Sequence, residues 1–265
     1  MDWSKIKTIF IITFLILDVY LLFQFMKIRD ANKFEVITEA TFEEKLKADE
    51  IKYVDLPKEA IKAQYLSAKP KTFTQKDIEK IKDQTVVVRS TGTTLFAKLE
   101  KPLQLSSKFE PAELSTFLKN NVLFGDDYQF GEKSDKNKTI TYFQQLETYP
   151  LFNNINGMIT FTMDEDNQIV SYEQTFLESI EKLTGKEEIL RPLNAIETLH
   201  QKGMLKSKSK ITEVELGYST LIQLAASQVL APTWRFEVND KESLFVNAFE
   251  GQIIQFNSDD KSKVE

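Results

Sequence analysis

The first strong pattern along the chain is an apolar run close to its N-terminus. Nineteen residues, 8–26, lie between Lys7 and Lys27; fifteen of them are apolar, and Asp18 is the one ionisable residue among them. As a helix this run spans about 28 Å, which matches the hydrocarbon core of a bilayer. No small-x-small cleavage site precedes Lys27. The pattern therefore predicts an uncleaved transmembrane anchor helix at 8–26, after a short tail at 1–7.

Flanking charges give little guidance on the orientation of this helix. Lys5 and Lys7 on one side face Lys27, Arg29 and Lys33 on the other, so the positive-inside count is close to a tie. A short tail, one apolar helix and a long polar chain are typical of a signal-anchor, whose C-terminal part is translocated. We therefore expect a single-pass protein of the cell membrane, with a cytoplasmic N-terminus and an extracellular C-terminal domain.

The next segment, 27–108, alternates charged and apolar residues and predicts a membrane-proximal α+β part of a first lobe. Short helices are expected at 41–46, with Thr41 as the cap, and at 74–82, with Thr74 as the cap. Strands are expected at 34–37, 86–88 and 94–97. Such a mixture of short elements indicates an α+β fold and carries no catalytic motif.

From residue 109 onward one pattern occurs twice, in which a helix that starts with proline is followed by four strand candidates. The helices are expected at 111–121 and 192–202. The strands are expected at 128–131, 139–147, 157–163 and 168–176, and again at 211–218, 229–239, 243–249 and 252–256. The repeat predicts an α+β chain with two tandem lobes, each a helix plus an antiparallel sheet. The first lobe would end at 185, the second would occupy 186–257, and 258–265 would be a polar tail.

Composition narrows the class of function. The chain has no cysteine and one histidine, His200, so thiol nucleophiles, disulfides and Cys/His zinc sites are excluded. No Gly-x-Ser-x-Gly motif is present, and the acidic turn at 164–166 lacks the spacing of a calcium loop. The net charge of −6 opposes binding to nucleic acid. We therefore expect a protein without enzymatic activity, cofactor, metal site or nucleic-acid partner.

Asp18 is the first candidate for partner binding. It lies within one residue of the midpoint of the apolar run, where an aspartate costs about 2.5–3.5 kcal/mol on insertion scales. A hydrogen bond to a neighbouring transmembrane helix would reduce that cost. The alternative is that its apolar neighbours simply carry one unfavourable residue into the membrane.

Three further polar residues share one stripe of the same helix. At the helical period, Tyr20 and Gln24 lie about 20° to either side of Thr13, whereas Asp18 lies about 140° away. Two separate polar faces could contact two neighbouring helices. The alternative is that Tyr20 and Gln24 merely approach the membrane interface.

The sequence also resembles a known family in two places. Residues 1–10, MDWSKIKTIF, joined directly to the apolar run, resemble the opening of the YycI (WalI) family. Residues 234–236, WRF, and 245–251, FVNAFEG, are similar to the carboxy-terminal strands of that family. The second of these segments also resembles PepSY-like hairpins in general, so by itself it indicates a fold and not a role.

The resemblance implies a membrane-anchored accessory protein of an essential cell-wall two-component system. Members of the family contact the sensor histidine kinase YycG (WalK) within and outside the membrane, together with the related YycH protein. The resemblance implies no catalytic residues, and it does not say whether the kinase is activated or inhibited. The competing hypothesis is an extracellular module that binds a peptide or a cell-wall ligand, with the helix as a tether only.

Overall fold

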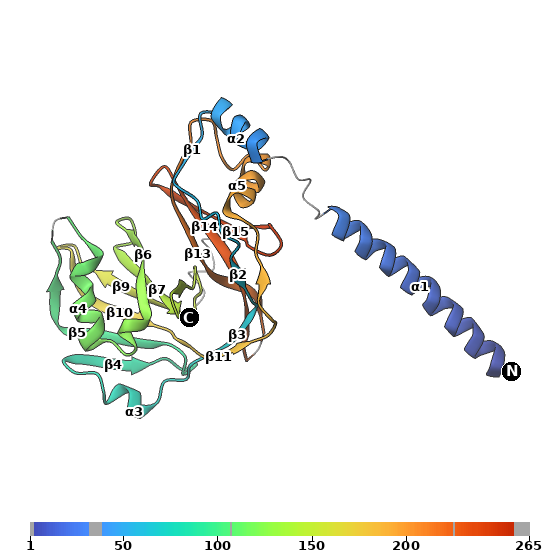
Figure 1. Cartoon of the computed structure of the whole chain (residues 1–265). Helices are drawn as coiled ribbons and strands as arrows, with labels where there is room; N and C mark the ends of the chain where they lie inside the picture. The colour runs from blue at the N-terminus through green and yellow to red at the C-terminus, as the bar shows by residue number, and fades with distance from the viewer. Residues whose placement is uncertain (1–2, 32–38, 107, 225, 257–265) are drawn as a thin grey trace. The chain divides into compact units, whose positions relative to one another are not determined.

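The computed structural model describes residues 3–31, 39–106, 108–224 and 226–256 (Figure 1). The chain divides into two units, Met1–Ile51 and Lys52–Glu265. The polar tail expected at 258–265 and the strand expected at 34–37 lie outside the described residues.

The first unit is helical. Its helix α1 (Trp3–Ala31) contains the predicted apolar run, and the segment Lys7–Met26 is long and apolar enough to cross a membrane, with a mean hydropathy of 2.3. The second helix is α2 (Glu39–Ala48). Because α2 begins at Glu39, the prediction that Thr41 caps it is wrong, and Thr41 lies inside the helix.

The first sheet of the second unit has the strand order β4-β5-β10-β9-β7-β6, and every pair is antiparallel. The short strand β8 pairs with β7 at the end of the sheet. The strands are β4 (Gln84–Val88), β5 (Leu95–Gln104), β6 (Tyr128–Ser134), β7 (Thr139–Leu146), β8 (Tyr149–Pro150), β9 (Met158–Met163) and β10 (Gln168–Gln174).

Three helical segments accompany this sheet. The 3-10 turn η1 (Pro111–Leu114) leads into α4 (Ser115–Asn121), and η2 (Gly125–Asp127) precedes β6. The helix predicted at 74–82 is shorter than expected, since α3 spans Gln75–Ile78. Its start is nevertheless where the sequence indicates, because the Thr74 N–H and hydroxyl both donate to Asp77 Oδ2 at 2.9 Å.

The core of the first lobe lies between α4 and the sheet. Leu114 and Leu118 are buried there together with Phe161 and Tyr172. Phe161 contacts three aromatic rings, with centroids 6.1 Å from Phe117, 5.9 Å from Tyr142 and 5.5 Å from Tyr172. Alternation along β9, buried at 159, 161 and 163, places these residues on the covered face.

The second sheet repeats the same arrangement. After α5 (Pro192–Gln201) the chain forms a meander in the spatial order β13-β14-β15-β16. These strands are β13 (Lys210–Gln223), β14 (Gln228–Val238), β15 (Glu242–Asn247) and β16 (Ile253–Ile254). The predicted repeat of a helix followed by a four-stranded meander is therefore confirmed in both lobes.

The second sheet also includes strands from outside its own repeat, which the sequence did not predict. β1 (Lys52–Tyr53) pairs parallel with β13, so this sheet is not wholly antiparallel. β3 (Leu66–Pro70) pairs with β14, and β11 (Leu177–Lys182) pairs with β3. A separate pair joins β2 (Lys62–Ala63) to β12 (Glu187–Glu188). The domain boundaries at 109 and 186 stay a prediction. The second sheet includes strands from before residue 109, β1 and β3, and one from before residue 186, β11.

Several hydrogen bonds join the two sheets within the second unit. The side-chain amide of Gln144 on β7 donates to the Leu177 carbonyl at 2.8 Å and accepts from the Leu177 N–H at 2.7 Å. The Phe152 N–H donates to the Tyr218 carbonyl at 2.8 Å. A Cβ atom at Gly217 would lie 2.4 Å from the Pro150 carbonyl oxygen, so only glycine allows this close approach.

Candidate functional site

The helix α1, the candidate transmembrane segment, exposes its apolar side chains, whereas the rest of the chain buries most of its large apolar side chains. Every described side chain from Lys7 to Met26 is exposed except Gln24, which is half-buried. Leu15, for example, is 60% exposed and Phe23 is 66% exposed. Such a helix is stable in a bilayer because its own backbone hydrogen bonds are satisfied along the span, and its side chains contact lipid or other helices.

The structure brings together two of the three residues predicted for the polar stripe. Gln24 Nε2 donates a hydrogen bond to the Tyr20 hydroxyl oxygen at 2.9 Å, one turn away. Thr13 instead donates its hydroxyl to the carbonyl of Ile9 at 2.9 Å. The stripe therefore carries a Tyr20–Gln24 pair and a hydroxyl that is bonded to its own helix. Each of these polar groups keeps an oxygen that can accept a further hydrogen bond.

Asp18 differs from the stripe because its carboxylate is exposed and has no hydrogen bond or ion pair to any residue that the structure describes. Four acceptor sites on two oxygens thus face outward from the middle of the span. The structure places the four predicted residues on two faces of one helix, as the spacing indicates. Their roles in partner binding stay a prediction.

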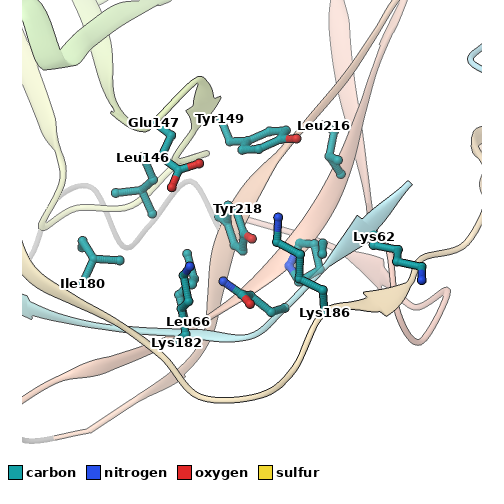
Figure 2. Close-up of a pocket in the computed structure, with 13 residues that line it drawn as sticks. Lys62, Leu66, Leu146, Glu147, Tyr149, Ile180, Lys182, Lys186, Leu216 and Tyr218 are labelled. Atoms are coloured by element: carbon teal, nitrogen blue, oxygen red, sulfur yellow. The ribbon is translucent and has the colours of Figure 1, made fainter. Parts of the chain in front are cut away.

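A pocket in the second unit is a further candidate that the sequence analysis missed (Figure 2). It has a volume of about 230 Å³ and lies where the β7–β8 turn of the first sheet meets the second sheet. Its apolar wall includes Leu66, Leu146 and Tyr218, which belong to one buried cluster. Tyr149 completes this wall, with its ring centroid 6.1 Å from that of Tyr218.

The polar rim of this pocket is mainly basic. Lys62, Lys182 and Lys186 line it, and Glu147 is the one acidic residue among its lining side chains. In Figure 2 the amines of Lys182 and Lys186 reach into the space below Glu147 and Tyr149, whereas Lys62 points away. Within the described part of the chain, neither Lys182 nor Lys186 has an ion-pair partner.

Electrostatics at the floor of the pocket keep its hydroxyl neutral. Burial raises the pKa of Tyr218, and the nearby Tyr149 and Glu147 act in the same direction, although a hydrogen bond from the Gln64 backbone N–H opposes them. The pocket therefore presents a protonated phenol next to exposed lysine side chains. This combination can hold an anionic group next to an apolar body.

A larger and more open groove lies on another side of the same unit, between β6 and β7 of the first sheet and β14, β15 and β16 of the second. Its volume is about 1120 Å³. Both signs of charge line it, with Lys133 and Arg235 beside Glu132 and Glu237. Arg235 is already engaged, since it binds Glu213 at 2.8 Å and Glu215 at 3.2 Å. This groove offers no single charge for a ligand to match.

Among the described residues, no group of three or more His, Cys, Asp or Glu side chains is placed to hold a metal ion. The acidic turn before β10 is instead organised by Asp164, whose Oδ1 accepts from the backbone N–H groups of Asp166 and Gln168 at 3.0 and 2.9 Å.

The comparison with protein families decides the assignment. The sequence model of a family described as "YycI protein" matches residues 31–249, which is most of the chain and includes both lobes. This chain belongs to the YycI family. The match begins at residue 31, after the apolar run at 8–26, so the resemblance of residues 1–10 is a separate observation from the family match.

Three solved structures are similar to this YycI-family chain. A protein from Eubacterium rectale is 11% identical with a TM-score of 0.43, and the match covers 78% of this chain and 89% of that one. YycH from Bacillus subtilis is 17% identical with a TM-score of 0.39, covering 77% of this chain and 54% of YycH. The C-terminal domain of YpeB from Bacillus megaterium is 11% identical with a TM-score of 0.34, covering 83% and 99%. A search of curated proteins found no match.

Proposed function

We propose that this YycI-family chain is a membrane-anchored, non-enzymatic regulator of an essential cell-wall two-component system. It modulates the sensor histidine kinase YycG (WalK) through transmembrane and extracellular contacts, together with a YycH-type paralogue. The observation that carries the proposal is the family match over 31–249, directly after a helix that can cross a membrane. In this arrangement α1 anchors the chain, its N-terminus is cytoplasmic, and the two lobes are extracellular.

The exposed polar groups of α1 support a contact inside the membrane. A carboxylate near the middle of the span has no partner among the described residues, and hydrocarbon offers none. A hydrogen-bond donor on a neighbouring helix satisfies it, and such interhelical bonds contribute about 0.6–2 kcal/mol. Asp18 therefore favours association with a helix that carries a donor at the same depth.

The stripe of Thr13, Tyr20 and Gln24 supports a second contact on another face. Tyr20 and Gln24 already bond to each other, so these two polar groups are partly satisfied before any partner helix binds. The stripe is accordingly the weaker of the two contacts. Two faces of unequal strength suit a complex in which α1 lies between a kinase helix and the helix of a paralogue.

The experiment that tests the proposal is a helix exchange. The full chain and a version whose segment 8–26 is replaced by an unrelated spanning helix are each purified from native membranes in mild detergent. Both samples are scored for the kinase and for the paralogue. We expect the kinase to copurify with the full chain and to be strongly reduced in the exchanged version.

A control exchange sharpens this test. The same foreign helix is prepared with an aspartate at the position of Asp18 and with Thr, Tyr and Gln at the positions of Thr13, Tyr20 and Gln24. Partial recovery of the kinase supports recognition by these side chains. Undiminished copurification with the plain foreign helix contradicts a role for α1 beyond anchoring, and absence of the kinase from every sample contradicts the proposed function.

A further inference from the structure

The pocket between the β7–β8 turn and the second sheet has features of a ligand site that the proposed function does not use. Its lysines belong to an acidic chain of net charge −6, so a cluster of lysines with no ion-pair partner among the described residues is a local exception. Lys182 ends β11 and Lys186 directly precedes β12, so one short connection carries both of them to the rim. Lys62 comes from a distant segment, β2, which pairs with β12.

The backbone around these lysines is held in place. The segment 183–186 connects β11 to β12, and its Leu183 N–H donates to the Tyr65 carbonyl at 2.9 Å. The Tyr65 N–H in turn donates to the Thr184 hydroxyl oxygen at 3.2 Å. Both lysines therefore start from fixed Cα positions, although their amines are exposed and free to turn toward a ligand.

The acidic member of the rim is held in a costly conformation. Glu147 has a φ of 60° in the two-residue turn between β7 and β8, where Asn or Gly is the usual residue. A glutamate in this conformation costs free energy, and its carboxylate places a hydrogen-bond acceptor at the edge of a basic pocket. A ligand that matches both features carries an anion toward the lysines and an N–H donor toward Glu147.

Apolar side chains determine the rest of the ligand. Leu66, Leu146 and Tyr218 form the buried part of the wall, while Leu216 is half-buried and Ile180 is 41% exposed. The volume of about 230 Å³ is below the usual range for drug-sized ligands, so the pocket suits one aliphatic side chain and not a long acyl chain.

We propose that this pocket binds a small aliphatic carboxylate with an adjacent amide N–H, as found in an N-acylated amino acid or in the C-terminal residue of a peptide. The carboxylate binds Lys182 and Lys186, the amide N–H donates to Glu147, and the aliphatic side chain packs against Leu66, Leu146 and Leu216. The occupant contacts both sheets at once, because Leu146 and Glu147 belong to the β7–β8 hairpin of the first sheet, whereas Leu66, Lys182 and Leu216 lie on strands of the second. This proposal does not depend on the kinase.

The test uses the full chain in neutral detergent and N-acetyl-leucine as the probe, followed by saturation-transfer NMR. Empty micelles give the background. We expect saturable binding with a Kd of about 1 mM, the range for so small a ligand. N-acetyl-leucinamide, which keeps the shape but lacks the carboxylate, should bind at least tenfold more weakly because a charge-assisted hydrogen bond is lost.

The variants assign the binding to this pocket. The double change of Lys182→Gln and Lys186→Gln should raise the Kd for N-acetyl-leucine at least tenfold, whereas Lys206→Gln, at an exposed lysine that does not line the pocket, should leave it unchanged. Unfolding curves confirm that both variants fold. Equal binding of the acid and the amide, or equal binding by both variants, overturns the proposal.

Two further probes separate the sources of the ligand chemistry. Tighter binding of N-acetyl-alanyl-alanyl-leucine than of N-acetyl-leucine supports the end of a peptide, and equal binding supports the single acylated residue. Displacement of N-acetyl-leucine by inorganic phosphate at equal concentration shows an adventitious ion only, and overturns the proposal, because phosphate has neither the aliphatic part nor the N–H donor.

Discussion

The two-sheet unit buries its large apolar side chains, whereas the helix α1 exposes them. In the two-sheet unit, Phe161 and Phe236 have no exposed surface and Trp234 is 2% exposed. In α1, Leu15 and Phe23 are exposed over more than half of their surface. The unit therefore carries its own core, whereas α1 needs lipid or partner helices around it. A substitution in the unit reports on folding, and a substitution in α1 reports on association.

The largest effect on the folding of the two-sheet unit is expected from Phe161→Ala. The change leaves a cavity among Phe117, Tyr142 and Tyr172, and such truncations cost about 3–5 kcal/mol. Urea unfolding of the full chain in neutral detergent, followed by circular dichroism, measures the loss. The control is Val87→Ala, at a 55% exposed position, which should change the free energy of unfolding by less than about 0.5 kcal/mol. Equal effects of the two changes would contradict this picture of the core.

A smaller effect is expected from Gly217→Ala, which tests how the two sheets are joined. The new methyl group would meet the Pro150 carbonyl oxygen at 2.4 Å and the ring of Phe152 at 2.6 Å. Overpacking of this kind costs about 1–3 kcal/mol. The matched control is Gly185→Ala, since a Cβ there meets no atom within 4 Å. A neutral Gly217→Ala, measured by the same unfolding curves, would show that the approach of residues 150–152 to β13 is not tight.

A third prediction concerns pH and the start of α3. Burial alone raises the pKa of Asp77, but the hydrogen bonds from Thr74 and the charges of Lys71 and Lys80 lower it below its usual value. A lowered pKa in the folded state stabilises the fold at pH values above the ordinary carboxyl pKa of about 3.9, and this contribution is lost as the pH falls through the folded-state pKa.

Removing the Asp77 carboxylate tests whether its ionised form stabilises the fold. Asp77→Ala should lower the free energy of unfolding at neutral pH by about 1 kcal/mol, the usual value of a helix cap. The difference from the unchanged chain should shrink as the pH is lowered below 4, in unfolding curves recorded at several pH values. Asp77→Asn keeps an acceptor for the Thr74 N–H and separates the hydrogen bond from the charge. A difference that stays constant with pH would show that the ionised form is not the stabilising one.

The sequence predicted the regular parts of both units because their patterns are local. The length of the apolar run at 8–26 by itself predicts a spanning helix, which lies within α1. The prolines at 111 and 192 are the first residues of η1 and α5, as the sequence predicts. The turn between β14 and β15 is equally local, since Asn239 and Asp240 take the left-handed conformation that their side chains tolerate. Burial alternates along β9 and in the second half of β14, where Trp234, Phe236 and Val238 are buried.

The pairing of distant segments was not readable in the same way. β1 and β2 contain two residues each, too few to show alternation, and both include a lysine. Each gains its strand character only from a partner far along the chain, β13 for β1 and β12 for β2. The pocket depends on the same pairings, because Lys62, Lys182 and Tyr218 meet only after the second sheet has formed. No local motif could have indicated it, whereas Asp18 was conspicuous from its apolar neighbours alone.

The smallest effect on folding, and the clearest separation of the two regions, is expected from Asp18→Leu. The side chain is exposed and has no partner in the described chain, so the free energy of unfolding of the two-sheet unit should not change measurably. Association with the kinase should weaken by about 0.6–2 kcal/mol, which is roughly three- to thirtyfold, because one interhelical hydrogen bond is lost. Quantitative copurification from native membranes measures it, with Leu22→Ala as the control for altered apolar surface and Asp18→Asn as the variant that keeps an acceptor. Asn should retain much of the association if hydrogen bonding is what Asp18 supplies. Full retention by Leu would contradict the role of Asp18 and leave recognition to the stripe of Thr13, Tyr20 and Gln24 or to the lobes.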